Sequence, residues 1–534
     1  MKVVIIGGGA AGISTATRLR RRDENAEIVI LEKNKEFGVA ACALPYLLGG
    51  LIESSEDITG ATAEQMRQIF KIDVKLEHEV IDIDRKNKIL TIEGKTPVSY
   101  DKLVLATGAV QLRPDIEGVL GDNIFTVRDL HSVDKIKVYF EGTGARKVLI
   151  LGGGNVGLET AEAFMRLGAD VCVVEEAPHL MPHFDPEVMR RLENHLQNLG
   201  VKLYLKRKVT AFCDNYALLD NDVKIKYDMV IIATGVRPDV KLPIMANIHL
   251  GHSGGILTNE YMQTNDPDIF AAGADVEFTN AVTGQPERWP SAARSVTQGN
   301  IIADFMSGLK TPFGAVVTCD IALIFGYTAA CAGANEKQLT QSGIEFRRLY
   351  LLQNNCDIYM PNSEQMLLKL LYSPDGRILG IQGIGRGGID KRIDIVANLM
   401  KKGGTVEDLS RATVAYSPPY AMAKDALNNL GNLAGAALRG EIRYYDFEDL
   451  NLNEDIFLVD IRQPESFEAR HLPRAVNIPL ATIRSNLASF PHDKKIVFYC
   501  GHGYGAYIAY CILRNRGFDN VYLLNTPYDL GIDL

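Results

Sequence analysis

Residues 3–12 read Val3-Val4-Ile5-Ile6-Gly7-Gly8-Gly9-Ala10-Ala11-Gly12. The four β-branched residues predict a buried strand, and the spaced glycines after them predict a sharp turn into a helix. In this pattern the first glycine makes the turn, the second lets a pyrophosphate approach the backbone, and the third lets the helix pack on the strand. The N-terminus of the helix then holds the phosphates. The stretch therefore predicts a dinucleotide-binding β-α-β unit.

The same pattern returns about 145 residues later as Val148-Leu149-Ile150-Leu151-Gly152-Gly153-Gly154-Asn155-Val156-Gly157. An acidic residue follows each glycine fingerprint at a similar distance. Each half also carries an apolar strand that ends in Ala-Thr-Gly, at Lys102–Gly108 and at Met229–Gly235. This internal repeat predicts two related α/β modules that bind two dinucleotides side by side. Electrons would pass from one dinucleotide to the other.

Composition narrows the class of protein. The chain has 534 residues, of which 46% are hydrophobic and 23% charged, as in ordinary globular proteins. A formal charge of −9 argues against nucleic-acid binding. No apolar run reaches the length of about 20 residues that a membrane helix needs. Met1-Lys2 leads straight into a strand and leaves no room for a signal peptide, and the eight cysteines form no CxxC pair. We therefore expect a cytoplasmic protein with free thiols and no metal site.

The order of patterns predicts an α/β chain with two Rossmann-like dinucleotide-binding domains, followed by an α+β domain and a C-terminal α/β domain. Alternating strands such as Met366–Tyr372 follow the second module, and Gly431–Gly440 is a soft boundary rich in Gly, Ala and Asn. After it, Ile456–Asp460 and Lys495–Cys500 look like buried parallel strands. The expected domain bounds are 1–112 with 245–315 and 113–244 for the two dinucleotide-binding domains, 316–435 for the α+β domain and 441–534 for the last α/β domain.

FAD is the predicted occupant of the first site. Glu32 ends the second strand, where a carboxylate accepts hydrogen bonds from ribose hydroxyls. Asp268–Gly273, followed by Asp275, resembles a second flavin-binding strand whose acidic residue bonds the ribityl chain. The alternative is that the glycines only shape a packing turn. The predicted contacts are Gly7, Gly9, Ala10, Ala11, Gly12, Glu32, Lys33, Val80, Ala106, Thr107, Gly108 and Asp275.

The second site is predicted to take a nicotinamide dinucleotide. A carboxylate at Glu175 or Glu176 would bind a free 2′-hydroxyl and repel a 2′-phosphate, which favours NADH over NADPH. The basic run Lys206–Lys208 either accepts a phosphate or forms a solvated turn. Glu159 orients a lysine or the nicotinamide, or it caps the turn. The predicted contacts are Gly152, Gly154, Asn155, Val156, Gly157, Glu159, Glu175 and Gly235.

One cysteine stands out. Cys42 lies in Gly38-Val39-Ala40-Ala41-Cys42-Ala43-Leu44-Pro45-Tyr46, where a helix is expected to begin. A helix N-terminus there would lower the pKa of the thiol and favour the thiolate. The alternative is a small buried core cysteine among alanines.

These motifs resemble the single-cysteine flavin disulfide reductases, a group that includes coenzyme A-disulfide reductases and NADH oxidases. Asp390-Lys391-Arg392-Ile393-Asp394 and Ala415-Tyr416-Ser417-Pro418-Pro419-Tyr420 are further matches. The C-terminal part resembles a rhodanese domain through Val459–Arg462, His471–Leu480 and Tyr499-Cys500. The resemblance covers nearly the whole chain and is strongest to coenzyme A-disulfide reductases with a fused rhodanese domain, also seen as polysulfide or persulfide reductases. It implies that 1–112 with 245–315 bind FAD, that 113–244 bind NAD(H), that 316–435 form an α+β dimerisation domain and that 441–534 form an α/β rhodanese domain.

The resemblance implies roles for several residues. Cys42 would cycle as a mixed disulfide with coenzyme A or as a persulfide. Cys500 would carry sulfane sulfur that the backbone amides of the following loop Gly501–Ala506 would bind, or else it is a core cysteine. Tyr359 and Tyr416 would reach the partner subunit's cysteine across a homodimer interface, or else only pack there. Arg18 and Arg22 would meet coenzyme A phosphates, or else belong to an exposed basic run.

Three departures from the family bear on this expectation. Gly38, Ala41 and Ala43 replace Ser, Asn and Gly beside Cys42. The flavin strand has Gly273-Ala274-Asp275 in place of Gly-Asp, which turns the carboxylate to another direction. Gly505 replaces the arginine that rhodanese loops commonly carry.

The leading hypothesis is an FAD- and NAD(P)H-dependent reductase of coenzyme A disulfide, persulfide or polysulfide that acts through Cys42 on small-molecule sulfur substrates. A second hypothesis is an NADH oxidase or peroxidase that cycles Cys42 through sulfenic acid. A third is a sulfur-binding protein with impaired electron transfer, motivated by the departures.

Overall fold

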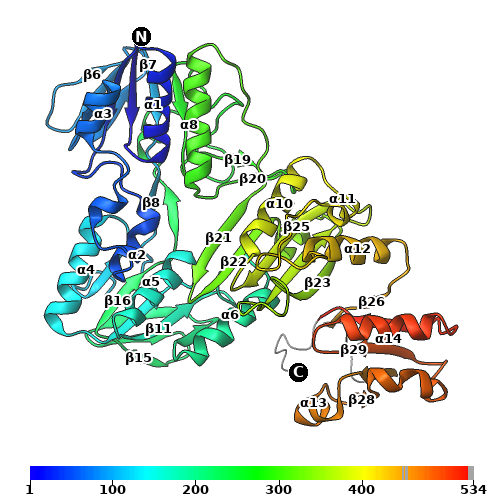
Figure 1. The fold of residues 1–534 in the computed structure, drawn as a ribbon. Coiled ribbons are helices and arrows are strands. Elements are labelled where there is room, and N and C mark those ends of the chain that lie inside the picture. The colour runs from blue at the N-terminus through cyan, green and yellow to red at the C-terminus, as the bar shows by residue number, and fades with distance from the viewer. Residues whose placement is uncertain (448–449, 451–454, 527–534) are drawn as a thin grey trace. The chain divides into compact units, whose positions relative to one another are not determined.

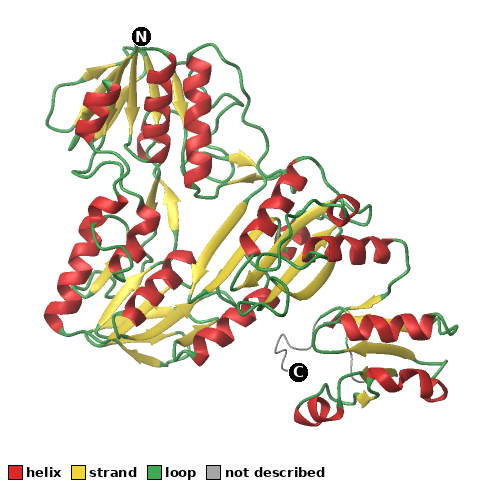
Figure 2. Cartoon of the chain, in the orientation of Figure 1, coloured by secondary structure: helices red, strands yellow, loops and turns green. Residues whose placement is uncertain are grey.

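The computed structural model describes residues 1–447, 450 and 455–526, and its chain forms two compact units. The first comprises Met1–Leu180 and Gly200–Val316, and the second Met181–Leu199 and Val317–Leu534. Figure 1 and Figure 2 show strands and helices interleaved in both units. The predicted α/β fold class is confirmed.

The first unit contains a parallel sheet built on the first glycine fingerprint. Its order is β18-β7-β1-β2-β3, with β1 at Lys2–Ile6, β2 at Glu27–Leu31, β3 at Asp73–Lys75, β7 at Lys102–Leu105 and β18 at Ile269–Ala271. All its pairs are parallel, and Val3, Val4 and Ile5 are fully buried, which explains the continuous apolar run in β1. Helices α1 (Ala10–Arg22) and α8 (Ala292–Met306) lie side by side (Figure 1). A Cβ at Gly299 of α8 would lie 2.6 Å from the carbonyl oxygen of Ala11, so this contact requires glycine.

A second parallel sheet repeats this plan. Its order is β12-β11-β10-β16-β9, with β9 at Ile124–Thr126, β10 at Lys147–Leu151, β11 at Asp170–Glu175, β12 at Lys202–Leu205 and β16 at Met229–Ile232. Helix α5 (Asn155–Arg166) follows β10 as α1 follows β1. The amide of Gly152 donates to the carbonyl of Val174 at 2.9 Å, and Gly7 donates to Leu31 at the same distance. The two modules therefore share their register as well as their motif.

Shorter elements complete the first unit. The helices are α2 (Leu44–Leu48), α3 (Ala63–Phe70), α4 (Leu130–Thr143) and α7 (Lys241–Met245). Antiparallel pairing joins β8 (Ala109–Gln111) to β17 (Val236–Pro238), one strand after each Ala-Thr-Gly turn. The remaining strands are β4 (Val80–Asp84), β5 (Ile89–Ile92), β6 (Val98–Ser99), β13 (Val209–Cys213), β14 (Tyr216–Leu219), β15 (Lys224–Lys226), β19 (Phe278–Thr279) and β20 (Pro286–Glu287).

The second unit contains an antiparallel sheet and a parallel sheet. The antiparallel order is β21-β22-β25-β24-β23, with β21 at Cys319–Ile324, β22 at Tyr327–Gly333, β23 at Arg347–Asn354, β24 at Gln365–Tyr372 and β25 at Ile378–Gly385. Its helices are α6 (Pro186–Asn198), α9 (Glu336–Gln341), α10 (Ile389–Lys401), α11 (Val406–Ser410) and α12 (Ala426–Leu438).

The parallel sheet of the second unit has the order β26-β30-β29-β27-β28, with β26 at Tyr444–Tyr445, β27 at Ile456–Asp460, β28 at Val476–Asn477, β29 at Lys495–Tyr499 and β30 at Val521–Leu524. Helices α13 (Pro464–Ala469) and α14 (Tyr504–Arg514) accompany this sheet, and residues 527–534 of the predicted rhodanese range lie outside the described residues.

The predicted soft boundary at Gly431–Gly440 is mostly helical. Helix α12 runs through most of it, and its N-terminus is capped by the Asp425 carboxylate, which accepts from the Leu427 amide. A Cβ at Gly431 would lie 2.2 Å from the amide nitrogen of Ser410 on α11. Gly431, one of the glycines that suggested a boundary, allows helices α11 and α12 to approach closely.

A buried lysine joins α6 to the antiparallel sheet of the second unit. Lys369 of β24 is fully buried, and its ammonium lies 2.9 Å from Asp185, 3.1 Å from Glu187 and 2.7 Å from Glu336. Burial opposes the charge, yet the Tyr350 ring and the three carboxylates raise the pKa of Lys369. Asp185 also exchanges two hydrogen bonds with Gln382 of β25, each 2.7 Å long. This network fixes α6 to the sheet.

Candidate active site

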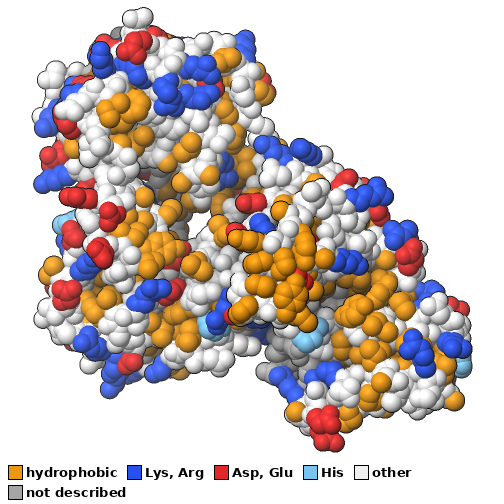
Figure 3. All heavy atoms as spheres, in the orientation of Figure 1, with side chains coloured by type: hydrophobic (Ala, Val, Ile, Leu, Met, Phe, Trp, Pro, Cys, Tyr) orange, Lys and Arg blue, Asp and Glu red, His pale blue; other side chains and the backbone are white. Residues whose placement is uncertain are grey.

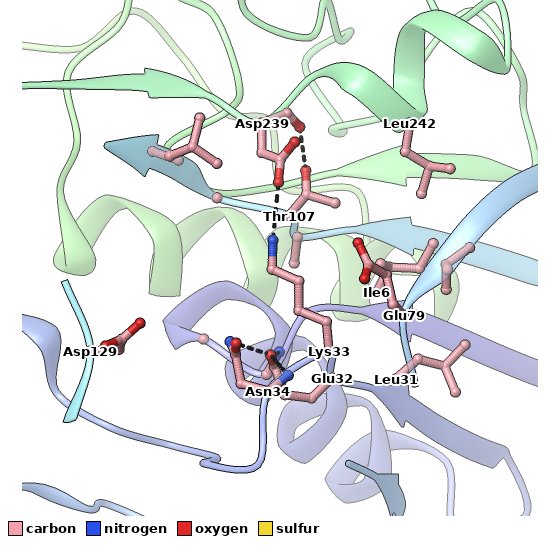
Figure 4. Close-up of a pocket in the computed structure, with 18 of the residues that line it drawn as sticks. Ile6, Leu31, Glu32, Lys33, Asn34, Glu79, Thr107, Asp129, Asp239 and Leu242 are labelled. Atoms are coloured by element: carbon pink, nitrogen blue, oxygen red, sulfur yellow. Dashed lines mark hydrogen bonds and ion pairs between the residues drawn. The ribbon is translucent and has the colours of Figure 1, made fainter. Parts of the chain in front are cut away.

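A cavity of about 700 Å³ opens beside the first glycine turn (Figure 4). It is lined by residues from the fingerprint, from the end of β2, from β4, from the Ala-Thr-Gly turn after β7, and from the start of α4. The predicted contacts that line it are Gly7, Gly9, Glu32, Lys33, Val80, Ala106, Thr107 and Gly108. The lining also includes Ala41, the neighbour of Cys42. One cavity therefore extends from the glycine fingerprint to the segment of the lone cysteine.

The backbone of this turn is shaped as dinucleotide binding requires. Gly7 has φ +107°, and a Cβ there would lie 2.2 Å from the carbonyl oxygen of Ala106. A Cβ at Gly12 would lie 2.0 Å from the carbonyl oxygen of Gly7, so the third glycine allows α1 to pack on the turn. Gly9 caps α1 and would meet nothing within 4 Å, which leaves the N-terminus of the helix open to a phosphate. The residues present therefore fit a dinucleotide.

Glu32 is held in place by hydrogen bonds to the glycine turn and to Asn34. Its carboxylate accepts from the Gly8 amide at 2.8 Å and from the backbone and side-chain nitrogens of Asn34 at 2.9 and 2.8 Å. Figure 4 shows Lys33 pointing across the cavity to Asp239, with an ammonium–carboxylate distance of 3.4 Å. The acidic side chain is oriented while its remaining lone pairs stay available to ribose hydroxyls.

Asp275 does not line this cavity but contacts two residues that do, Thr107 and Gly108. The carboxylate is fully buried behind the lining, and it accepts from the Thr107 hydroxyl at 2.7 Å and the Gly108 amide at 3.1 Å. The Thr107 hydroxyl also lies 2.8 Å from the carbonyl oxygen of Asp239. The single hydrogen of the Thr107 hydroxyl cannot be donated to both oxygens at once. When Asp275 is protonated, its carboxyl group donates to the Thr107 oxygen and the Thr107 hydroxyl donates to the Asp239 carbonyl oxygen. Burial raises the pKa of Asp275 to about 7 despite these hydrogen bonds. The residue after Ala274 thus supports the Thr107–Gly108 turn, and its direct contact with a cofactor stays a prediction.

An Asp275→Asn variant is expected to show how this burial affects stability. An aspartate whose pKa rises from 3.8 to about 7 stabilises the fold below pH 4 and loses that stability as pH rises through 7. Asparagine does not titrate, so the melting temperature of the variant should rise relative to the wild type between pH 4 and 7. The limit is about 4 kcal/mol, from roughly 1.36 kcal/mol per pKa unit.

Asp268→Asn is the control for this comparison. Lys102 and Lys88 lower the pKa of Asp268, so this carboxylate is ionised in both the folded and the unfolded state above pH 4, and the melting temperature of Asp268→Asn should keep a constant offset from the wild type between pH 4 and 7. A constant difference between Asp275→Asn and the wild type across this pH range would contradict the role assigned to burial.

The second fingerprint repeats the geometry of the first. Gly152 has φ +110°, and a Cβ at Gly157 would lie 2.0 Å from its carbonyl oxygen. The Glu175 carboxylate accepts from the amides of Gly153 and Ala177, both at 2.7 Å, which matches the position of Glu32 in the first module. Glu176 is exposed and pairs with Lys208 at 3.3 Å. Of the two candidate acids, Glu175 is the one placed to bind a ribose.

The segment that carries Cys42 contributes to the cavity of the first module and packs on α5 of the second. It occupies a short 3-10 turn, Ala41–Ala43, that leads into α2, and its side chain is exposed. The expectation of a lowered thiol pKa is wrong. Partial desolvation and the charge of Glu159 raise the pKa of Cys42, and they outweigh a backbone hydrogen bond and Arg128, which lower it. Helix α2 has only five residues, too few for a strong terminal dipole.

Tyr46 was missed as a site residue. Its hydroxyl donates to the Glu159 carboxylate at 3.0 Å, and desolvation and that carboxylate raise its pKa. Helix α2 packs so closely on α5 that a Cβ at Gly49 would lie 2.9 Å from Ala163. Tyr46 is therefore one partner of Glu159, in addition to the lysine or nicotinamide that the sequence suggests for it. No sequence signal pairs residues so far apart.

Both predicted tyrosines in the second unit converge on one carboxylate. The hydroxyls of Tyr359 and Tyr416 donate to Asp357 at 3.1 and 2.9 Å. These bonds help to raise the pKa of both tyrosines, that of Tyr416 to about 12, so they remain protonated donors at neutral pH. Hydrophobic side chains gather on the surface of this unit (Figure 3), and the exposed ones nearby in sequence include Ile358 and Tyr420.

Cys500 lies at the end of β29, buried beneath a tight loop. The Gly503 amide donates to its sulfur at 3.1 Å, and Gly503 has φ +86°. Helix α14 begins at the next residue, so its N-terminus faces the sulfur. A Cβ at Gly505 would lie 2.7 Å from the terminal methyl group of Ile461, an atom that a side-chain movement could displace.

Arg18 and Arg22 form ion pairs within the first unit. Both guanidinium groups bind Asp304 of α8, Arg18 through two bonds of 2.8 and 2.7 Å and Arg22 through one of 3.2 Å. Their contact with coenzyme A stays a prediction.

Comparison with known proteins gives the family. Residues 1–295 match the pyridine nucleotide-disulphide oxidoreductase family, residues 320–426 its dimerisation domain and residues 446–529 the rhodanese-like domain. The chain belongs to the pyridine nucleotide-disulphide oxidoreductases. This confirms the predicted family and an oxidoreductase that uses FAD and NAD(H).

Three relatives show the range within this family of oxidoreductases. The chain is 33% identical over 459 residues to an NADH oxidase of Methanocaldococcus jannaschii, covering 81% of this chain and 100% of the relative. It is 28% identical over 437 residues to a coenzyme A disulfide reductase of Staphylococcus haemolyticus, covering 80% and 98%. A structure of an NAD-dependent persulfide reductase from A. fulgidus matches with a TM-score of 0.95 and 32% identity, covering 100% of both chains.

Two further findings concern this oxidoreductase. No helix among the described residues is long and apolar enough to cross a membrane. Within the same residues, no cluster of three or more His, Cys, Asp or Glu side chains could hold a metal ion.

Proposed function

We propose that this chain reduces sulfur–sulfur bonds with electrons from NADH, through FAD and Cys42. One observation carries the proposal. The cavity at the first fingerprint reaches Ala41, and the helix after Cys42 packs on α5 of the second fingerprint. A single sulfur therefore lies beside both predicted nucleotide sites. FAD, when bound, would accept electrons from NADH and deliver them to a disulfide at this cysteine.

The protein's own residues perform the sulfur chemistry. The Cys42 thiolate attacks one sulfur of an R–S–S–R′ substrate, forms a mixed disulfide with RS, and releases R′S⁻. Two electrons then break the mixed disulfide, which gives the Cys42 thiolate and RS⁻, and each released thiolate takes a proton. Since no second cysteine forms a CxxC pair with Cys42, the substrate sulfur takes the place of a resolving thiol.

Coenzyme A disulfide and persulfides are the proposed substrates. The names of the Staphylococcus and A. fulgidus relatives support this class, and so does the rhodanese-like domain. Arg18 and Arg22 are the proposed contacts for coenzyme A phosphates. Cys500 would carry sulfane sulfur as a persulfide, for which the Gly503 amide is a suitable donor.

A homodimer is the proposed assembly. The dimerisation domain supports it, and Tyr359 and Tyr416, held by Asp357, would donate hydrogen bonds near Cys42 of the partner subunit. The cytoplasmic location and the domain boundaries given above stay predictions.

One experiment tests the electron path. The purified protein should have a flavin spectrum that bleaches when NADH is added without oxygen, and less readily with NADPH because Glu175 repels a 2′-phosphate. Intact mass without reductant should show a coenzyme A adduct that dithiothreitol removes. A colourless protein, or one whose flavin NADH leaves oxidised, would overturn the proposal in favour of a sulfur-binding protein with impaired electron transfer.

A second candidate function is oxygen or peroxide reduction through a Cys42 sulfenic acid. The similarity to an NADH oxidase favours it. Steady NADH consumption in air without a sulfur substrate would support it, and consumption that requires a disulfide or polysulfide would exclude it as the main activity.

A further inference from the structure

Two walls of the cavity at the first fingerprint are fixed by hydrogen bonds. On one wall, the Glu32 carboxylate accepts from the Gly8 amide at 2.8 Å, which holds the end of β2. On the other wall, the Asp239 amide donates to the carbonyl oxygen of Gly108 at 3.0 Å, and the Asp239 carbonyl oxygen lies 2.8 Å from the Thr107 hydroxyl. All five residues line the cavity, so both of its walls have a backbone that is held in place.

One ion pair joins these two walls. Figure 4 shows the Lys33 side chain extending from the end of β2 across the cavity, and its ammonium lies 3.4 Å from the Asp239 carboxylate. The two residues are 206 positions apart in the sequence, so no local motif predicts that they meet. The Asp239 side chain is 24% exposed and that of Lys33 48%, so solvent reaches the pair only in part. Among the described residues that line the cavity, no other ion pair crosses it.

We propose that Asp239 is a positioning residue that acts through Lys33, and that their ion pair, here called the clasp, retains the adenosine half of FAD in this cavity. The fingerprint places that half beside Glu32, because a carboxylate at this position binds a ribose, and Lys33 is the next residue of the chain. Release of FAD then requires the ion pair to open. The inference rests on the proposed placement of FAD at the first fingerprint, and it is independent of the sulfur chemistry at Cys42.

The neighbouring charges show that this pairing is specific. Lys35 follows on the same segment, but it pairs with Glu77 at 3.9 Å, and neither residue lines the cavity. Lys241 lies two residues after Asp239 and does line the cavity, yet Asp239 forms its ion pair with Lys33. An ion pair that bound FAD shields from water is screened less than an exposed pair. The clasp should therefore affect FAD binding, and the pair of Lys35 with Glu77 should not.

The rate of FAD release from the holoenzyme tests the clasp without turnover. The holoenzyme is diluted, free FAD is separated by rapid filtration, and its fluorescence is followed over time. Asp239→Asn and Lys33→Met should each release FAD about two- to fivefold faster than the wild type, as expected for loss of a partly exposed ion pair. The double variant should be no faster than the faster single variant, because both substitutions break the same contact. Added potassium chloride should speed release from the wild type more than from Asp239→Asn.

Lys35→Met and Glu77→Gln are the matched controls, because they break an ion pair of the same segment that does not cross the cavity. Both should release FAD at the wild-type rate. Equal rates in Asp239→Asn and the wild type would overturn the inference. So would additive effects of Asp239→Asn and Lys33→Met, which would mean that Lys33 contacts FAD without Asp239. A protein purified without flavin would overturn the proposed function and this inference together, whereas bound flavin that every variant releases equally fast would overturn the clasp alone.

Discussion

A Cys42→Ser variant should lose disulfide- and persulfide-dependent NADH oxidation by about a thousandfold or more. A serine oxygen cannot form the mixed disulfide, so neither the attack on substrate nor the two-electron cleavage has a sulfur to act on. The cavity at the first fingerprint does not include the Cys42 side chain, so we expect cofactor retention and bleaching by NADH to persist. Steady-state assays and an anaerobic NADH titration of the same sample measure the two effects.

Cys319→Ser is the matched control for this variant. Cys319 is exposed as Cys42 is, but it lies on β21 in the second unit. It should retain wild-type activity. Persistence of sulfur-dependent NADH oxidation in Cys42→Ser would show that another group receives the electrons, and the proposed role of this cysteine would then be wrong.

A Lys369→Met variant should lose about 3–5 kcal/mol of unfolding free energy. The substitution roughly keeps the volume but removes a buried ammonium, and it leaves Asp185, Glu187 and Glu336 facing one another. Uncompensated carboxylates in a buried site repel each other and lack the solvation that water would give. Chemical denaturation followed by circular dichroism measures the loss, and adding Glu336→Gln should restore part of it.

The control for Lys369→Met is Arg439→Met. Arg439 pairs with Glu407 and Glu441, but all three side chains are about half exposed. Solvent screens such pairs, so this variant should unfold much like the wild type. If Lys369→Met and Arg439→Met were equally stable, the buried network would not be what fixes α6 to the sheet.

The sequence predicted those parts of the fold that depend on local pattern. The glycine fingerprints, the Ala-Thr-Gly turns and the buried strands follow from spacing and periodicity, because backbone sterics decide which residue fits at Gly7 or Gly12. Gly431 shows the limit of such reasoning, because the same residue type serves a linker or a close helix contact, and only its neighbour Ser410 distinguishes the two.

The electrostatics of the site could not be predicted in the same way. The pKa of Cys42 depends on Glu159, which lies more than a hundred residues away in sequence, and Tyr46 meets that residue only because two helices pack. Asp275 follows β18 one residue later than the flavin motif has its acid, and its environment is set by Thr107 in the turn after β7. Contacts of this kind arise from tertiary packing, which a single sequence does not encode locally.

The twin carboxylates Glu32 and Glu175 have a consequence for how nucleotides associate. Each is anchored to the amide of its own fingerprint's middle glycine and to a second amide just beyond its strand. Their rotamers are fixed before any ligand arrives, so docking freezes no further side-chain motion at these positions. As the predicted ribose contacts, these carboxylates would exchange water for sugar hydroxyls on a rigid acceptor. Both dinucleotide-binding modules of the first unit would therefore bind ribose with a carboxylate that is already oriented, because the duplicated module keeps the same hydrogen bonds in each copy.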